Sequence, residues 1–312
     1  MADAQILVGD VGGTHARFAL ARPDGSLADV ATFEVRDFAT AEDAVDQYLG
    51  SLSQHPKTFC IASAGKRTGD EIALTNAHWV LGEEALRDRF GFEKGILIND
   101  FHALAQGAAG ASLGQMIEVQ AGEAGMEAPR LCLGPGTGFG QALILPGLPP
   151  RVVPTEGGFR LLPVRTKRDR DLFACLEREL GAPPIVEEGL SGRGFVHLLS
   201  ALRGQAQTLE APAITAAALA GPGDEREAVM WFLELLATAA ADACLMTGAW
   251  GGVIIGGGVV PRIVSLLDRE AFSATFARSS PMQEQLERVP VHLMTDGLAA
   301  LRGAAALAFQ TA

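Results

Sequence analysis

The stretch LVGDVGGTHARFAL, residues 7–20, decides the fold. It reads as an apolar strand ending at Asp10, a turn through Gly12, Gly13 and Thr14, and a second apolar strand. Glycines at such a turn let backbone N–H groups point into one space, which is the geometry that binds phosphate. A carboxylate at the strand end can orient the water around Mg²⁺, which takes few carboxylates. An ordinary hairpin with an exposed aspartate fits the same residues, so this segment alone leaves both interpretations open.

Two further glycine-rich turns follow apolar strands. LCLGPGTGFGQALIL, residues 131–145, has a turn at 136–138, and GVIIGGGVVPRI, residues 252–263, has one at 256–258. The first two turns fit neither GxxxxGK[ST] nor the dinucleotide fingerprint GxGxxG. Bare backbone at the third turn would admit a flat group such as a purine. One such turn is weak evidence, but three of them favour a single bound nucleotide.

The segment ILINDF, residues 96–101, places Asn99 and Asp100 at the carboxyl end of a short buried strand. Open α/β sheets bind their ligands at this end of the strands. A carboxylate there can accept the proton of a substrate hydroxyl as that hydroxyl attacks phosphorus. The alternative is that Asp100 only caps the helix that follows.

The order of elements indicates an α/β protein with mixed sheets flanked by helices. Three strands at 5–10, 15–23 and 27–35 have short links, so they are antiparallel. A helix at 40–52 with Thr40 as its N-cap follows, and strands and helices alternate from there. We also expect one helix at 225–250 and another at 262–270. Because the glycine turn near 9–14 recurs near 134–140, the chain reads as two related halves hinged about a cleft.

The composition excludes several classes of protein. The chain has 312 residues, 48% of them hydrophobic, and its net charge is −12, which argues against nucleic acid as a partner. The four cysteines have no metal-ligand spacing, and we expect buried, reduced thiols. The first residues lack the basic region of a signal peptide. The apolar stretch 231–250 is interrupted by Glu234 and Asp242, which suits a buried helix. We therefore expect a cytoplasmic protein without a membrane partner.

Seven segments in order resemble the bacterial ATP-dependent glucokinases of the non-ROK group, within the actin-like sugar-kinase superfamily. They cover nearly the whole chain: LVGDVGGTHARFAL, TGDEIALTNAHW, LIND, GPGTGFG, TEGG, EEGLSGRGFV and GVIIGGGVVPRI. The resemblance implies a two-domain actin-like ATPase (ribonuclease H-like) fold. It also implies a small domain of residues 1–110 with about 298–312, a large domain of 111–297, and a homodimer.

The resemblance also assigns roles to residues. Asp100 matches the base that takes the proton of the sugar 6-hydroxyl, and Asn99 matches a residue that binds sugar hydroxyls. Glu156 and Glu187 match the carboxylates that hold the far side of the sugar, with Gly138 and Phe159 beside them. Asp10 matches the carboxylate that lies near Mg²⁺ and holds it through water. The residues matched to ATP are Gly9, Asp10, Val11, Gly12, Gly13, Thr14, Gly136, Thr137, Gly256, Gly257 and Gly258.

Three positions depart from the family pattern. Phe159 stands where the family usually has His, so one hydrogen bond to the anomeric end of glucose, worth roughly 0.5–1.5 kcal/mol, should be missing. His15 replaces the usual Asn, and Lys66 stands where Pro is common. We therefore expect a kinase that makes glucose 6-phosphate from glucose and ATP. The alternatives are a kinase for mannose, fructose or another hexose, and a non-catalytic sugar sensor on the same scaffold.

Overall fold

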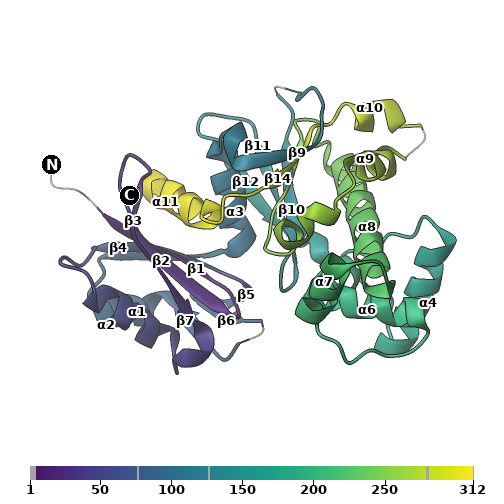
Figure 1. Ribbon diagram of the computed structural model, residues 1–312. Coiled ribbons are helices and arrows are strands. Elements are labelled where there is room, and N and C mark those ends of the chain that lie inside the picture. The colour runs from purple at the N-terminus through teal and green to yellow at the C-terminus, as the bar shows by residue number, and fades with distance from the viewer. Residues whose placement is uncertain (1–4, 76, 126, 279–280, 312) are drawn as a thin grey trace. The chain divides into compact units, whose positions relative to one another are not determined.

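The computed structural model describes residues 5–75, 77–125, 127–278 and 281–311. The chain divides into two compact units (Figure 1). The first consists of Met1–Ala111 and Asp296–Ala312, and the second of Ser112–Thr295.

The first unit is built on a mixed sheet of five strands in the order β3-β2-β1-β4-β8. Strands β1, β2 and β3 form the predicted antiparallel meander, and β1, β4 and β8 run parallel. The strands β5, β6 and β7 form a small second sheet, in which neighbouring strands are antiparallel. The bounds are β1 Ile6–Val11, β2 His15–Ala21, β3 Leu27–Glu34, β4 Thr58–Ser63, β5 Gly65–Thr68, β6 Glu71–Leu74, β7 Val80–Gly82 and β8 Lys94–Asn99.

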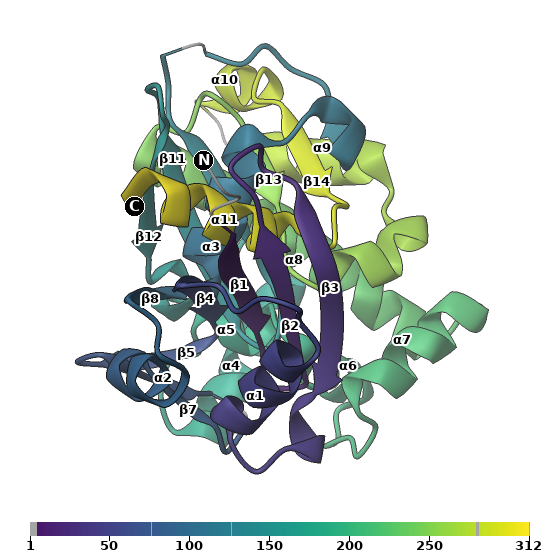
Figure 2. The ribbon, with the colours of Figure 1, turned by 90° about the vertical axis from the view of Figure 1, so that its left-hand side faces the viewer.

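Helices cover both faces of the five-stranded sheet, as Figure 2 shows. On one face lie α1 and α2, and on the other lies α11, which packs along α3. The predicted cap of α1 is confirmed, since Thr40 and Asp43 form a reciprocal capping box. The bounds are η1 Val35–Asp37, α1 Ala41–Gly50, α2 Glu83–Phe90, α3 Asp100–Gly110 and α11 Ala299–Thr311.

Two glycines let α3 and α11 approach closely. A Cβ at Gly303 would collide with the carbonyl oxygen of Ala103, and one at Gly107 would collide with that of Ala299. We expect Gly303→Ala to lower the free energy of unfolding by about 1–3 kcal/mol, because the helices must separate to admit the methyl group. Denaturant melts measure this change.

Gly110→Ala is the matched control for that substitution. Gly110 is the last residue of α3 and has open space where a Cβ would lie. Alanine should leave stability unchanged or raise it slightly, because it favours helix over glycine. A Gly303→Ala variant as stable as Gly110→Ala would contradict the packing argument.

The second unit repeats the strand order of the first. Its sheet runs β12-β11-β10-β13-β14-β9, with an antiparallel meander of β10, β11 and β12 beside the parallel strands β13 and β14. Strand β9 adds an antiparallel edge. This common order is what the recurring glycine turn predicts. The bounds are β9 Met116–Gln120, β10 Arg130–Pro135, β11 Phe139–Leu145, β12 Arg151–Thr155, β13 Val253–Ile255 and β14 Val291–Met294.

The core of the second unit forms around the long helix α8, Asp224–Thr247. Among the described residues it is the one helix long and apolar enough to cross a membrane, and 72% of its most apolar window is buried inside the protein. It therefore has the burial expected of a core helix. The other helices are η2 Leu113–Gln115, η3 Gly157–Phe159, α4 Lys167–Leu180, α5 Val186–Gly189, α6 Gly192–Arg203, α7 Ala211–Ala220, η4 Val260–Leu266, α9 Arg269–Ala277 and α10 Gln283–Glu287.

The prediction of one helix over 262–270 is wrong. The chain instead forms the 3₁₀ helix η4, which contains Pro261 in its first turn, and then becomes extended at Leu267. A new helix, α9, starts because the Asp268 side chain accepts a hydrogen bond from the Ala271 N–H (3.0 Å). The cap thus divides the segment 262–270, although its hydrophobic pattern is continuous.

Candidate active site

In the first unit, three parallel strands end level with one another. Val11 of β1 pairs with Ser63 of β4, and Ser63 pairs with Asn99 of β8. Asp10 and the Asn99–Asp100 pair, which lie far apart in the sequence, are therefore brought to the same edge of the sheet.

Asn99 and Asp100 mark the junction between β8 and α3. Asn99 is the N-cap, and its Oδ1 accepts a hydrogen bond from the His102 N–H at 3.1 Å. Asp100 is the first helical residue, and its Oδ1 accepts from the Phe101 N–H at 2.9 Å. The positive end of the helix dipole favours a carboxylate there. The capping role therefore belongs to Asn99, and Asp100 is a fixed carboxylate at the strand end.

His102 lies two residues further along, in the first turn of α3. It is partly buried in α3, and this burial lowers the pKa of its imidazole below the usual value.

Two charged side chains that were not predicted form hydrogen bonds with the main chain of β8, the edge strand of the sheet. Glu83 Oε1 accepts from the Leu97 N–H (2.9 Å), and Arg67 Nη1 donates to the Leu97 carbonyl oxygen (2.6 Å). The two side chains also pair with each other at 2.9 Å. They supply the hydrogen bonds of a neighbouring strand two residues before Asn99. Lys66, next to Arg67, is exposed in β5.

Asp10 lies at the end of β1 with its side chain 28% exposed. Burial raises the pKa of its carboxyl, and Arg17, whose Nη1 is 4.0 Å from Asp10 Oδ2, opposes that effect. Beyond it, the Gly12 N–H donates to the His15 carbonyl oxygen (2.9 Å) and closes the turn. His15 Nε2 lies 3.1 Å from Glu34.

A lone, partly buried carboxylate fits Mg²⁺ only if the metal brings its other ligands. No group of three or more His, Cys, Asp or Glu side chains gathers to hold a metal in the described part of the chain. Asp10, with a single cation 4.0 Å away, would gain from a nearby dication. Since Mg²⁺ is usually held by one or two carboxylates, waters and substrate phosphates, Asp10 fits that arrangement.

The second unit brings two glycine turns together. Strands β10 and β13 are parallel neighbours, and a Cβ at Gly257 would collide with the Pro135 carbonyl oxygen. Gly257 also has φ +81, a conformation that favours glycine. The turns at 136–138 and 256–258 are therefore adjacent. Gly258 has open space where its Cβ would lie, which suits the approach of a ligand.

Glu187 is held at the start of β11. Its Oε2 accepts a hydrogen bond from the Phe139 N–H (2.9 Å), and a Cβ at Gly138 would collide with that same oxygen. Its side chain is only 18% exposed, and Arg193 Nη2 lies 3.5 Å from Oε1. Gly138 therefore makes room for a carboxylate of this protein.

Glu156 directly precedes η3 and Phe159 is its last residue, and η3 also packs on β11. A Cβ at Gly158 would collide with the Phe139 carbonyl oxygen, and Gly157 lies against Gln141. Glu156 is exposed, and the ring of Phe159 is 62% exposed. Both predicted sugar-facing glutamates thus lie on segments that contact the first residues of β11.

Three buried polar side chains near these turns were not predicted. Ser63 Oγ, Gln141 Oε1 and Ser191 Oγ are buried without a hydrogen-bond partner among the described residues. Ser63 pairs with Asn99, and Gln141 lies under Gly157. Of the three, only Ser63 has a signal in the sequence, as a polar residue at the end of the apolar run TFCIA.

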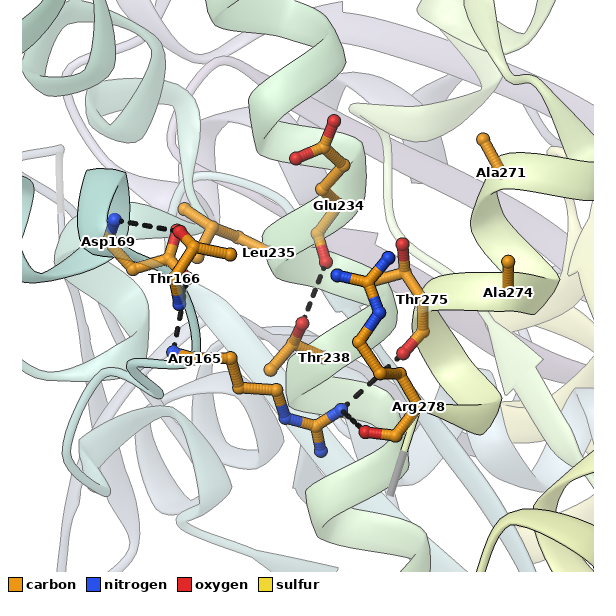
Figure 3. A pocket seen from close by; sticks show the side chains of 10 residues that line it. All are labelled: Arg165, Thr166, Asp169, Glu234, Leu235, Thr238, Ala271, Ala274, Thr275 and Arg278. Atoms are coloured by element: carbon orange, nitrogen blue, oxygen red, sulfur yellow. Dashed lines mark hydrogen bonds between the residues drawn. The ribbon is translucent and has the colours of Figure 1, made fainter. Parts of the chain in front are cut away.

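A cavity of about 230 Å³ lies among α4, α8 and α9 (Figure 3). None of the residues predicted for the site lines it. Its lining consists of Arg165, Thr166, Asp169, Glu234, Leu235, Thr238, Ala271, Ala274, Thr275 and Arg278.

Comparison with known proteins gives one consistent family. The family model for Glucokinase matches residues 7–311. The chain belongs to the glucokinase family. A glucokinase from Chromohalobacter salexigens is 35% identical over 305 residues, which cover 96% of this chain and 95% of that protein. A glucokinase from Pseudomonas aeruginosa strain UCBPP-PA14 is 36% identical over 308 residues, which cover 96% of this chain and 92% of that protein.

Solved structures of the glucokinase family agree with the fold. The crystal structure of a glucokinase from an Antarctic psychrotroph matches with a TM-score of 0.84 at 33% identity, covering 98% of this chain and 99% of its own. The glucose complex of the Balamuthia mandrillaris glucokinase matches with a TM-score of 0.83 at 21% identity, covering 98% and 94%. The actin-like α/β fold expected from the sequence is confirmed.

In this glucokinase-family chain, Asp10→Asn should raise the free energy of unfolding at pH 7. The folded pKa of Asp10 lies above its unfolded value of 3.8. Ionisation therefore costs stability at pH 7, and this cost disappears below pH 3.8, where both states are protonated. Asparagine removes this cost of ionisation, so the variant should be more stable. We also expect it to lose most of its phosphoryl transfer with Mg²⁺ and ATP.

Denaturant melts and turnover assays check both parts, with Asp24→Asn as control. Hydrogen bonds from Ser26 lower the pKa of Asp24, so the same substitution there should bring no gain in stability. An Asp10→Asn variant that is less stable than wild type at pH 7 would contradict this account.

Proposed function

We propose that this chain is an ATP-dependent glucokinase, which transfers the γ-phosphoryl group of ATP to the 6-hydroxyl of glucose and releases ADP. The observation that carries the proposal is the Asn99–Asp100 pair at the end of β8, level with the glycine turn after β1. The names of the curated relatives, which are glucokinases, support the same activity.

Asp100 acts as the general base. Its carboxylate takes the proton of the 6-hydroxyl while that oxygen forms a bond to the γ-phosphorus and the bond from phosphorus to the β-phosphate oxygen breaks. The Phe101 N–H fixes the carboxylate, so little reorganisation is needed when the proton moves.

Asn99, Glu156 and Glu187 bind the hydroxyls of the sugar. Carboxylates accept short, charge-assisted hydrogen bonds from several hydroxyls, which fixes the ring more firmly than neutral acceptors would. Gly138 contributes by leaving room for the Glu187 carboxylate. Phe159 offers an apolar ring edge and no hydrogen bond.

The three glycine turns bind ATP. The turns at 9–14 and 136–138 would face the phosphates, with the Gly12 and Gly136 N–H groups closing those turns, and 256–258 would admit the adenosine. Asp10 would hold Mg²⁺ through water. When bound, the metal neutralises charge on the β- and γ-phosphate oxygens.

The main competing function is phosphorylation of a different hexose. The ring of Phe159, 62% exposed beside Glu156, is the observation that favours it. A panel of glucose, mannose, fructose and other hexoses in a coupled ADP-release assay separates the two, with kcat/KM as the quantity compared. Glucose with the highest kcat/KM supports the proposal, and a higher value for another hexose replaces it. Sugar binding by calorimetry without turnover would indicate a sugar sensor.

We further propose a cytoplasmic homodimer, on the family resemblance alone. The net charge of −12 supports the absence of nucleic acid among its partners. Sedimentation velocity of the purified chain tests the dimer.

A further inference from the structure

The segment that carries Glu156 is hydrogen-bonded to the one that leads into Glu187. The Val186 N–H donates to the Arg160 carbonyl oxygen (2.8 Å), and the Leu162 N–H donates to the Pro184 carbonyl oxygen (2.9 Å). Between these bonds, Leu161 and Ile185 form an antiparallel bridge. The two glutamate-bearing segments therefore form one short ladder.

The side chain of Arg160 fastens this ladder to α8. Its Nη2 donates to the Ala239 carbonyl oxygen at 2.7 Å, in the middle of the most buried helix of the unit. Asp242, one turn further along α8, attracts the same guanidinium group. A charged hydrogen bond to a buried carbonyl fixes the ladder against the core.

Arg165 makes a second attachment a few residues later. Its Nη2 donates to Asp242 Oδ1 at 2.5 Å. Its Nη1 donates to the carbonyl oxygens of Thr275 (3.4 Å) in α9 and of Arg278 (3.1 Å) just after that helix, as the dashed lines in Figure 3 show. The chain between Glu156 and α4 is thus held at two points, by Arg160 on the Ala239 carbonyl and by Arg165 on Asp242.

The presence of an arginine at position 160 is not explained by folding stability alone. Its Nη1 is buried without a hydrogen-bond partner among the described residues. Burial also lowers the pKa of its guanidinium group. A buried and incompletely paired charge costs stability, and an apolar side chain of similar length is often tolerated as well or better.

We propose that Arg160 is a positioning residue for the sugar, which holds the Glu156 turn and the Glu187 segment in one fixed arrangement through its bond to Ala239. This inference rests on the proposed function, because it assumes that the two glutamates bind the sugar. It adds that their placement depends on a side chain that touches neither of them.

Arg160→Met in the full-length chain tests the proposal. We expect KM for glucose to rise about tenfold, since a small displacement of binding groups costs this much or more. KM for ATP should stay within about twofold, because main-chain pairing of β10 and β13 holds the ATP-facing turns. The melting temperature should stay the same or rise.

Two variants serve as comparison. Arg168→Met removes another arginine that links α4 to α8, through Glu234 at 2.7 Å and the Trp231 ring at 4.4 Å, but has no bond to the ladder. It should lower stability and leave KM for glucose unchanged. Arg160→Lys keeps a cation able to donate to the Ala239 carbonyl, and should recover most of the wild-type KM.

The outcomes separate the proposals. An Arg160→Met variant with wild-type KM for glucose overturns the positioning role, whatever its stability. Equal rises in both KM values also overturn it, because they indicate general damage. If Arg160→Met does not fold, Arg160→Gln is ranked against Arg160→Lys, and equal KM values overturn the role. A wild-type chain that phosphorylates no hexose removes the proposed function and this inference with it.

Discussion

Asp100→Asn should reduce kcat for glucose phosphorylation by about 10²–10⁴-fold while glucose still binds. Asparagine keeps the size of the side chain and an oxygen that can accept the Phe101 N–H, which Asp100 accepts at 2.9 Å. What it loses is the ability to take a proton. Steady-state kinetics gives kcat, and calorimetry with glucose gives the affinity.

Asp268→Asn is the matched control for this substitution. Asp268 is also an aspartate at a helix N-terminus, the N-cap of α9, where its side chain accepts the Ala271 N–H at 3.0 Å, and asparagine caps helices about as well. Its kcat should equal that of wild type. If Asp100→Asn also retains near-wild-type turnover, Asp100 is not the base.

Gly138→Ala should lower kcat/KM for glucose by about 10²-fold, because the Glu187 carboxylate must move away from the new methyl group. The clash falls on Oε2, the oxygen that accepts the Phe139 N–H. A displaced Glu187 loses that bond and the position that we propose for binding the sugar. Kinetics with glucose as the varied substrate measures the loss.

A double-mutant cycle with Glu187→Gln shows whether the effect acts through Glu187. If it does, Gly138→Ala added to Glu187→Gln should cost little more, because the displaced group has already been altered. Fully additive losses, or a Gly138→Ala variant as active as wild type, would contradict the assignment.

Features fixed by neighbouring residues could be predicted from the sequence. The Thr40 cap of α1, the antiparallel meander and the Asn99–Asp100 strand end each depend on a few adjacent residues. The break before α9 was missed because Asp268 lies within a continuous hydrophobic pattern, and a cap competes locally with helix propagation.

Features that join distant segments could not be predicted. Arg67 and Glu83 hold Leu97 because β8 lies at the sheet edge, and no local pattern reveals which strand is outermost. The bond from Arg160 to Ala239 spans 79 residues. Such contacts depend on the packed core and not on residue spacing.

The physical reason for a glycine at a given position also could not be predicted from the sequence. The family resemblance matched Gly9 and Gly257 to ATP and placed Gly138 beside the carboxylates that bind the sugar. In the structure, a side chain at Gly9 would meet Ile61 and Phe18, and one at Gly257 would meet the Pro135 carbonyl oxygen. These two positions need glycine for packing, whether or not ATP approaches them. Sequence alone cannot separate the two reasons.

The identity of the product tests the central claim most directly. Purified chain, glucose, ATP and Mg²⁺ are incubated, and phosphorus and carbon NMR identify the phosphorylated position while ADP is quantified. We predict glucose 6-phosphate in equal amount to ADP, with no ADP formed when glucose is omitted. ADP without sugar phosphate, phosphate on a different hydroxyl, or no reaction with glucose would contradict the account.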